Sequence, residues 1–343
     1  MANPASRLQL PNQGLYSSQR GLREKGMMLL ITMMLSFIGL LWAANHLVTG
    51  AAGIASHYRI PPLVTGLTLV AIGSSVPQIM FAIAAAFEGR NELALGNAIG
   101  ANIANIGLVL GLTLLYRPLT VKSSLLKREY PLLFLIMLFT YSLMIDGHLS
   151  VIDGCLFLVA CIVLILYFIV LAHHSKNDAM TKEYSQSLNI KRPLNAHLTS
   201  IIIGFAVLPL SAHFLVKSAV HFAHWLGISE LVLGLTIIAI GTSLPNIVTS
   251  MVAAFKRQDD IAVGNILGSN MFNLLIVMAF PGIINPSAIS HMLLWRDIPT
   301  MFFITLVLLW INYHYKSKIE RWHGGLLLLI YCCYITSLVF RAC

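Results

Sequence analysis

Charged residues are scarce in this sequence, and their scarcity sets the class of the protein. Only 10% of the 343 residues are charged, whereas 57% are hydrophobic and the mean hydropathy is +0.81. A soluble domain normally carries about 25% charged residues. The composition therefore excludes an ordinary soluble domain and predicts a polytopic membrane protein.

Three further absences narrow the function. The cysteines show no metal-ligand spacing, so we expect buried thiols at Cys155, Cys161, Cys332, Cys333 and Cys343. The sequence has no cluster of histidine, cysteine and carboxylate, no nucleophile motif and no phosphate-binding loop, which argues against an enzyme and predicts no cofactor. We also expect no cleaved signal peptide, because the first apolar run belongs to the internal repeat described below.

Apolar runs of membrane-spanning length follow one another along the chain. A helix crosses the hydrocarbon core in about 20 residues and satisfies its own backbone hydrogen bonds there. We predict an all-α fold with ten such helices, over residues 27–49, 62–87, 93–115, 130–146, 150–172, 198–224, 231–255, 261–282, 296–313 and 324–340. The remaining long polar stretches are an N-terminal tail (1–26) and a linker (173–197).

The positive charges lie mainly on one side of the predicted membrane. One set of loops contains Arg59, Arg117, Lys122, Lys127, Arg128, Lys176, Lys182, Lys191, Arg192, Lys256, Arg257, Lys316, Lys318 and Arg321. The other side has Arg90, Arg296, Arg341 and the basic residues of the tail. The positive-inside rule therefore predicts that the linker is cytoplasmic and that both termini lie outside. This distribution excludes a nucleic-acid partner and leaves the lipid bilayer and a transported ion or solute.

An internal repeat is the most informative feature of the sequence. Residues 63–107 and 231–275 align without a gap at a shift of 168, with about 20 of the 45 positions identical. The match continues weakly upstream, where WAANHLVTGA around Asn45 aligns with LSAHFLVKSA around His213. Five predicted spans separate equivalent points, so the second copy is inverted in the membrane. We therefore predict two inverted five-helix repeats, 27–172 and 198–343, an arrangement typical of secondary transporters.

Each repeat has a proline within an otherwise apolar span. The motifs are GSSVP at residues 73–77 and GTSLP at residues 241–245. Proline removes a backbone donor and clashes with the preceding turn, so we predict that Pro77 and Pro245 break their helices. Free carbonyls and hydroxyls in mid-membrane are tolerated only where they line a cavity or are buried in protein. A single motif is commonly a packing kink, but two at symmetric positions favour a binding site.

Asparagines follow in the second half of each repeat motif. Asn102 and Asn105 are three residues apart and share a helix face, and Asn270 and Asn273 repeat the pattern. An amide is costly in lipid, so we expect all four to face the interior of the bundle. Glycines four residues apart precede them in GNAIG and GNILG, which favours close approach of helices.

These motifs resemble the two α-repeats of the sodium/calcium exchanger superfamily, and the resemblance extends over essentially the whole chain after residue 26. It implies antiport of Ca²⁺ or another cation against Na⁺, K⁺ or H⁺, in a membrane protein of the compact bacterial type. It also implies a ligand set of hydroxyls, carbonyls and amides from the proline-containing helices and the helices after them. By position these are Ala71, Ser74, Ser75, Gln78, Asn105, Ala239, Thr242, Ser243, Asn246, Ser269 and Asn273.

The sequence departs from this family at its acidic positions. Gln78 and Asn246 stand where the family has two key glutamates, and Asn273 stands where many members have aspartate. Each of the thirteen carboxylates lies in a predicted loop, in the tail or near the end of a predicted span. Ca²⁺ normally takes six to eight oxygen ligands that include carboxylates. We therefore expect no tight Ca²⁺ site, and no proton antiport through these amides because they do not titrate.

A neutral oxygen cage can still hold a dehydrated monovalent ion. The leading hypothesis is therefore cation antiport by alternating access at a mid-membrane site. The alternatives are a transporter of a monovalent cation or of a small polar or charged solute, and a membrane scaffold that does not transport. Polar side chains retained in both repeats favour transport over the scaffold.

Two basic residues on the sixth predicted span leave a choice open. His213 and Lys217 are four residues apart on one face and could flank the site as an anion-binding or proton-carrying pair. We favour the alternative that Lys217 reaches the outer interface and that His213 is a packed helix residue. We expect the same of His46.

Overall fold

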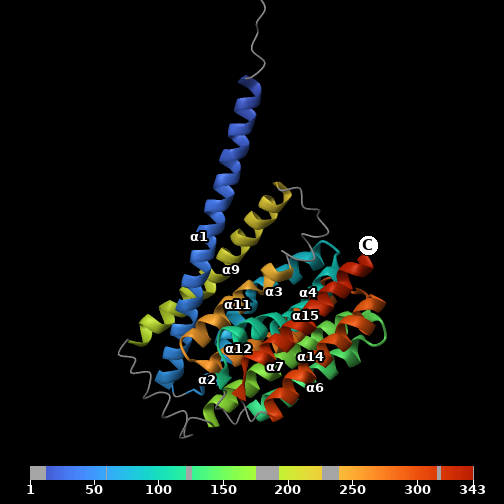
Figure 1. The fold of residues 1–343 in the computed structure, drawn as a ribbon. Helices are drawn as coiled ribbons and strands as arrows, with labels where there is room; N and C mark the ends of the chain where they lie inside the picture. The colour runs from blue at the N-terminus through green and yellow to red at the C-terminus, as the bar shows by residue number, and fades with distance from the viewer. Residues whose placement is uncertain are drawn as a thin grey trace, which may run out of the picture.

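The computed structural model describes residues 13–58, 60–120, 126–174, 193–225, 239–314 and 318–342. Within these ranges the protein is almost entirely helical (Figure 1). The first repeat consists of α1 (Gln13–Tyr58), α2 (Pro62–Thr65), the π-helix η1 (Gly66–Val70), α3 (Ala71–Phe87), α4 (Asn91–Ala104), the π-helix η2 (Asn105–Leu110), α5 (Gly111–Tyr116), α6 (Leu126–Met144) and α7 (Val151–His174). The second repeat consists of α9 (Leu194–Trp225), α11 (Ala239–Phe255), α12 (Asp259–Phe272), the π-helix η5 (Asn273–Val277), α13 (Met278–Ile284), the π-helix η6 (Leu293–Asp297), α14 (Ile298–His314) and α15 (Arg321–Ala342).

Two short antiparallel strand pairs connect the repeats. β1 (Leu119–Thr120) pairs with β4 (Lys318–Ile319), and β2 (His148–Leu149) pairs with β3 (Ser287–Ala288). Each pair therefore joins one strand from the first half of the chain to one from the second half.

Helices occupy all ten positions at which the sequence predicts a span. Among the described residues, seven helical segments are long and apolar enough to cross a membrane: Gly26–Tyr58, Leu63–Phe87, Asn91–Tyr116, Val151–His173, Leu194–Leu215, Asp259–Ile284 and Leu293–His314. Shorter apolar helices, Glu129–Met144 and Ser243–Phe255, and the helix α15 occupy the other three positions. Residues 231–238 of the seventh predicted span lie outside the described residues.

Several boundaries differ from the prediction. The tail predicted over residues 1–26 is helical from Gln13, because α1 continues beyond its apolar part. Figure 1 shows the N-terminal half of α1 projecting from the other helices. Most of the predicted linker, residues 175–192, lies outside the described residues. Of the four cysteines whose side chains are described, only Cys161 is buried, because the outer faces of α7 and α15 are apolar without being covered by protein.

Pro77 and Pro245 do not break their helices, contrary to the prediction. α3 continues through Pro77 and α11 continues through Pro245. A proline removes one backbone donor, so a helix that is packed on its neighbours can lose that single bond and remain helical. An irregular turn lies upstream of Pro77 in the π-helix η1, where the wider turn shifts the hydrogen-bond register.

α1 and α9 pack along one another as an antiparallel pair of equivalent helices. Small residues allow their close approach. A Cβ atom placed on Gly204 would lie 2.8 Å from the Cβ of Leu47, and one on Gly50 would lie 2.9 Å from the carbonyl oxygen of His197. The pair lies across the remaining helices, from which the C-terminal end of α9 stands clear (Figure 1).

The centre of the molecule depends on backbone-to-backbone packing between η1 and α12. A Cβ atom on Gly66 would lie 2.6 Å from the carbonyl oxygen of Ile261, and one on Gly268 would clash with the carbonyl oxygen of Leu67. Gly264 approaches the carbonyl oxygen of Leu63 in the same way, at 2.6 Å. These contacts leave no space for a side chain, and they join the two repeats next to the predicted site.

We expect Gly268→Ala to destabilise the protein by about 1–3 kcal/mol, because the added methyl group meets backbone that cannot rotate away. The apparent melting temperature in detergent, measured by loss of monodisperse protein on heating, should fall by several degrees. Gly325→Ala in α15 is the matched control, since its Cβ meets nothing within 4 Å. An alanine in an exposed helix is normally stabilising. Equal melting temperatures for the two variants would contradict the packing described here.

Candidate ion-binding site between the repeats

Buried polar side chains gather where α3, α4 and η2 meet α11, α12 and η5. We call this group the central polar cluster. Its members are at most 1% exposed, and they are Ser74, Ser75, Gln78, Asn102, Asn105, Ser243, Asn246, Asn265, Ser269, Asn270 and Asn273. Polar groups buried to this degree must satisfy one another or a ligand.

Four asparagines in this cluster form a reciprocal arrangement, which we call the asparagine clamp. The side-chain amide of Asn102 donates to the backbone carbonyl of Asn270 at 3.2 Å, and that of Asn270 donates to the carbonyl of Asn102 at 3.3 Å. Asn105 donates to the Oδ1 of Asn270 at 2.9 Å, and Asn273 donates to the Oδ1 of Asn102 at 3.1 Å. Each bond has its symmetric equivalent in the other repeat. The prediction that all four face the interior is therefore confirmed.

A second set of bonds extends the clamp through the proline-containing helices. Asn246 donates from Nδ2 to the Oδ1 of Asn105 at 3.1 Å, and the Ser269 hydroxyl donates to the Oδ1 of Asn246 at 3.1 Å. The Ser74 hydroxyl lies 2.8 Å from the Oδ1 of Asn265 and 3.3 Å from the Ser269 hydroxyl. Side-chain hydrogen bonds therefore connect the two repeats across the cluster.

The carbonyl oxygen of Ala71 also belongs to this arrangement. It lies 3.2 Å from the Ser74 hydroxyl and 3.5 Å from the Ser269 hydroxyl. Its lone pairs are therefore directed at the cluster rather than used only within η1 and α3.

Several oxygens of the cluster have no hydrogen-bond partner within the described structure. Three of them are the Oγ of Ser75, the Oγ of Ser243 and the Oδ1 of Asn273. Ser75 and Ser243 are equivalent positions of the two repeats. A buried oxygen without a partner costs roughly 1–3 kcal/mol. Uncharged oxygens of this kind can replace the hydration shell of a monovalent cation.

The structure gathers most of the residues that the sequence predicts for the site. Ala71, Ser74, Asn105, Asn246, Ser269 and Asn273 are linked by the bonds above, and Ser75, Gln78 and Ser243 are buried on the same helices. Ala239 and Thr242 belong to α11, but their side chains lie outside the described part of the structure.

Sequence reasoning missed two members of the network. Asn265 accepts from Ser74 and donates from Nδ2 to the Ser250 hydroxyl at 2.8 Å. Asn265 could have been found, since its equivalent Asn97 is also an asparagine. Ser250 could not, because Ala82 stands at the equivalent position and the repeat gives no signal there.

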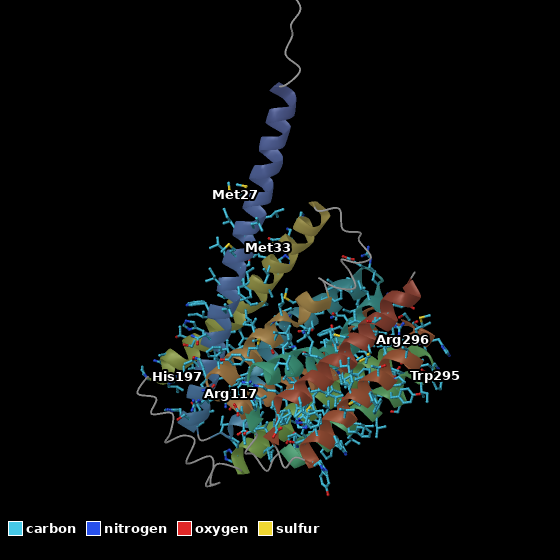
Figure 2. All side chains as sticks on the ribbon, viewed as in Figure 1. Met27, Met33, Arg117, His197, Trp295 and Arg296 are labelled. Carbon is cyan, nitrogen blue, oxygen red and sulfur yellow. The ribbon has the colours of Figure 1, made fainter. Side chains whose placement is uncertain are left out.

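The central polar cluster contains no carboxylate. The buried carboxylates among the described residues are Glu129 at the start of α6, Asp259 at the start of α12 and Asp297 in η6. Asp259 pairs with Arg117 at 3.1 Å, and Asp297 pairs with Arg296 at 2.7 Å. Figure 2 shows Arg117 and Arg296 well apart on the body of the molecule. The described carboxylates therefore lie near span ends, as predicted. The described residues also contain no group of three or more His, Cys, Asp or Glu side chains that could hold a metal ion.

The basic residues of α9 are exposed. His213 and Lys217 both face away from the protein interior, and the His213 ring lies 5.7 Å from that of Phe214. The prediction of a packed His213 is therefore wrong, because α1 covers only one face of α9. His46 is half-buried, with its ring 4.2 Å from that of Trp42.

The family model described as sodium/calcium exchanger protein matches residues 28–170 and 196–340. The chain belongs to the sodium/calcium exchanger family. The exchanger is 39% identical over 304 residues to the putative antiporter CaxA of Alkalimonas amylolytica, covering 88% of this chain and 95% of that protein. It is 38% identical over 286 residues to the inner membrane protein YrbG of Escherichia coli, covering 82% and 88%.

A solved structure of the sodium-calcium exchanger NCX_Mj has the same fold. It superposes with a TM-score of 0.78 at 29% identity and covers 91% of this exchanger and 99% of that chain. The ten-helix fold with inverted repeats and the family predicted from the sequence are confirmed. The protein is an integral membrane antiporter of the sodium/calcium exchanger type.

We expect Asn270→Leu to destabilise the exchanger by about 1–3 kcal/mol for each buried partner that it leaves unpaired. The partners are the amide of Asn105 and the carbonyl of Asn102. Thermal unfolding in detergent, followed by size-exclusion chromatography, measures the effect. Met301→Leu is the control, because it removes only the weak 3.6 Å contact of the Asn102 amide with sulfur. A melting temperature for Asn270→Leu within a degree of the control value would show that the clamp does not hold the repeats together.

Proposed function

We propose that the exchanger carries a monovalent cation, in preference to Ca²⁺, by alternating access at the central polar cluster. The observation that supports this most is the set of partnerless neutral oxygens, Ser75 Oγ, Ser243 Oγ and Asn273 Oδ1, in a cluster without carboxylates. Sodium is the first candidate, since the related NCX_Mj is named a sodium-calcium exchanger.

The preference follows from how two energies depend on ionic charge. The idealised cost of dehydrating a monovalent ion in a low-dielectric interior is on the order of 20 kcal/mol, and it grows with the square of the charge. The attraction of neutral dipoles for an ion grows only linearly with the charge. Replacing Na⁺ by Ca²⁺ therefore raises the cost about fourfold by this Born estimate and the attraction about twofold by the charge–dipole law. A carboxylate would close this gap, and the cluster has none.

The proposed ligands include the three partnerless oxygens and their polar neighbours in the two repeat motifs. They comprise the hydroxyls of Ser74, Ser75, Thr242, Ser243 and Ser269, the amides of Gln78, Asn105, Asn246 and Asn273, and the carbonyls of Ala71 and Ala239. The contact of the Ala71 carbonyl with two of these hydroxyls supports the assignment. The asparagine clamp would hold the ligands in place while the cation is bound.

The surroundings of the site are proposed from the charge pattern and the relatives. We place the exchanger in a bacterial inner membrane, with residues 173–197 in the cytoplasm and both termini outside. The repeat boundaries stay as predicted, 27–172 and 198–343. Transport moves the ion without covalent chemistry, so we propose no enzymatic activity.

Uptake by proteoliposomes tests the proposed substrate. We expect radioactive Na⁺ to exchange across the membrane at a rate well above that of empty vesicles, whereas a Na⁺ gradient drives no Ca²⁺ uptake. The double variant Gln78→Glu with Asn246→Glu should gain Ca²⁺ uptake, because it supplies two negative charges. Ca²⁺ uptake by the unmodified exchanger would overturn the preference for a monovalent ion.

A second pair of substitutions tests the proposed ligands. Ser75→Ala with Ser243→Ala removes two partnerless oxygens and should weaken Na⁺ binding at least about tenfold, since an interaction with a charged group contributes about 1.5–3 kcal/mol. The half-saturating Na⁺ concentration for exchange measures this change. Thr305→Val, a buried hydroxyl on α14 that bonds to its own helix, is the control. An unchanged half-saturating concentration in the double variant would exclude these hydroxyls as ligands.

A further inference from the structure

A side-chain hydrogen bond joins the α1–α9 pair to the core near the C-terminal end of α1. The Nζ of Lys256, in the turn between α11 and α12, donates to the hydroxyl of Thr49 on α1. Arg117 of the first repeat holds the same turn, because it donates to the carbonyl of Ala254 and pairs with Asp259 at 3.1 Å. We call the contact between Thr49 and Lys256 the first latch.

The internal repeat assigns an equivalent to each residue of this latch. At the shift of 168, Thr49 corresponds to Lys217 of α9, and Lys256 corresponds to Glu88 in the turn between α3 and α4. The hydroxyl and ammonium of one repeat are thus replaced by an ammonium and a carboxylate in the other. Lys217 and Glu88 are a complementary pair of charges at positions that the fold makes equivalent to a contact already formed.

The equivalent contact is not formed in this conformation. Glu88 pairs instead with Arg90 at 3.5 Å, and both side chains are largely exposed, at 62% and 68%. The ammonium of Lys217 has no hydrogen bond or ion pair among the described residues, and the side chain is exposed. The C-terminal part of α1 packs against α11, whereas the C-terminal end of α9 stands clear of the body of the molecule (Figure 1).

We propose that Lys217 and Glu88 form an ion pair, the second latch, when the exchanger adopts its opposite-facing conformation and the first latch opens. This inference rests on the proposed alternating access. In a protein of two inverted repeats, exchanging the conformations of the repeats converts closure on one side of the membrane into closure on the other. Lys217 then takes the position relative to Glu88 that Thr49 has relative to Lys256 here.

The chemistry of the second latch suits a contact that must open in every cycle. An exposed ion pair shifts an equilibrium by only about two- to fivefold, because water screens both charges. The pair therefore biases the opposite-facing conformation without trapping it. Arg90 provides Glu88 with an alternative partner while the second latch is open.

Cross-linking of the full-length exchanger in proteoliposomes tests the second latch. The background variant carries serine in place of all five cysteines. One test variant adds Lys217→Cys with Glu88→Cys, and the positive control adds Thr49→Cys with Lys256→Cys. We expect copper-phenanthroline to oxidise both pairs to disulfides. His213→Cys with Glu88→Cys, one helical turn away, should cross-link at least fivefold more slowly.

A variant with all four cysteines gives the decisive result. We expect each molecule to carry one disulfide or the other and never both, since the latches belong to different conformations. Two disulfides in one molecule would overturn the proposal. So would the absence of a disulfide between positions 217 and 88 when the positive control forms and Na⁺ exchange is intact, and that result would leave the proposed function standing. If the two disulfides are mutually exclusive but the protein does not exchange Na⁺, the proposal of the two latches is supported and Na⁺ is excluded as the substrate.

Charge reversal provides an independent measurement. Lys217→Glu should lower the exchange rate about two- to fivefold, the range for losing an exposed ion pair. Adding Glu88→Lys should restore the rate, because it re-creates a pair of opposite charges. An unchanged rate in the single variant, or no recovery in the double variant, would count against the second latch.

Discussion

The free-energy cost of removing a cation from water is the constraint on which the rest of this structure depends. Transport requires a site in the middle of the molecule, where the low dielectric constant makes that cost large. Under the proposed function the exchanger meets this constraint with neutral oxygens alone, because none of the carboxylates buried in the described part of the chain belongs to the central polar cluster. Neutral dipoles compensate a single charge far better than a double one, and this difference connects the sequence to the proposed substrate.

The inverted repeat explains how such a site can be both rigid and open to each side in turn. Within the cluster, reciprocal bonds between Asn102 and Asn270 hold the repeats together, and backbone contact at Gly268 does the same next to it. At the periphery the symmetry is broken, since α1 is fastened by Lys256 whereas α9 is not held at its equivalent point. A symmetric centre with an asymmetric periphery is what an alternating-access transporter requires.

Much of the fold could be predicted from the sequence, because the bilayer permits few solutions. The length of the apolar runs and the internal repeat predicted where the helices lie. The cost of burying amides in lipid predicted that the four asparagines of the clamp face the interior. The continuity of α3 through Pro77 could not be predicted, since it depends on packing and on the upstream π-turn. The pairing of Asn265 with Ser250 was also out of reach, because it lacks a symmetric equivalent and depends on which helix faces touch. The exposure of His213 depends on which faces of α9 are covered by α1, α3 and α11, and no local sequence pattern encodes that arrangement.

The most direct test of a neutral cation site is the charge that moves when an ion binds. Proteoliposomes on a solid-supported electrode can be exposed to a rapid concentration jump, and the transient current reports that charge. Since the site contributes no negative charge of its own, a Na⁺ jump should produce a transient that saturates with concentration and disappears in the variant Ser75→Ala with Ser243→Ala. A Ca²⁺ jump should produce none. A saturating Ca²⁺ transient in the unmodified exchanger would contradict the account.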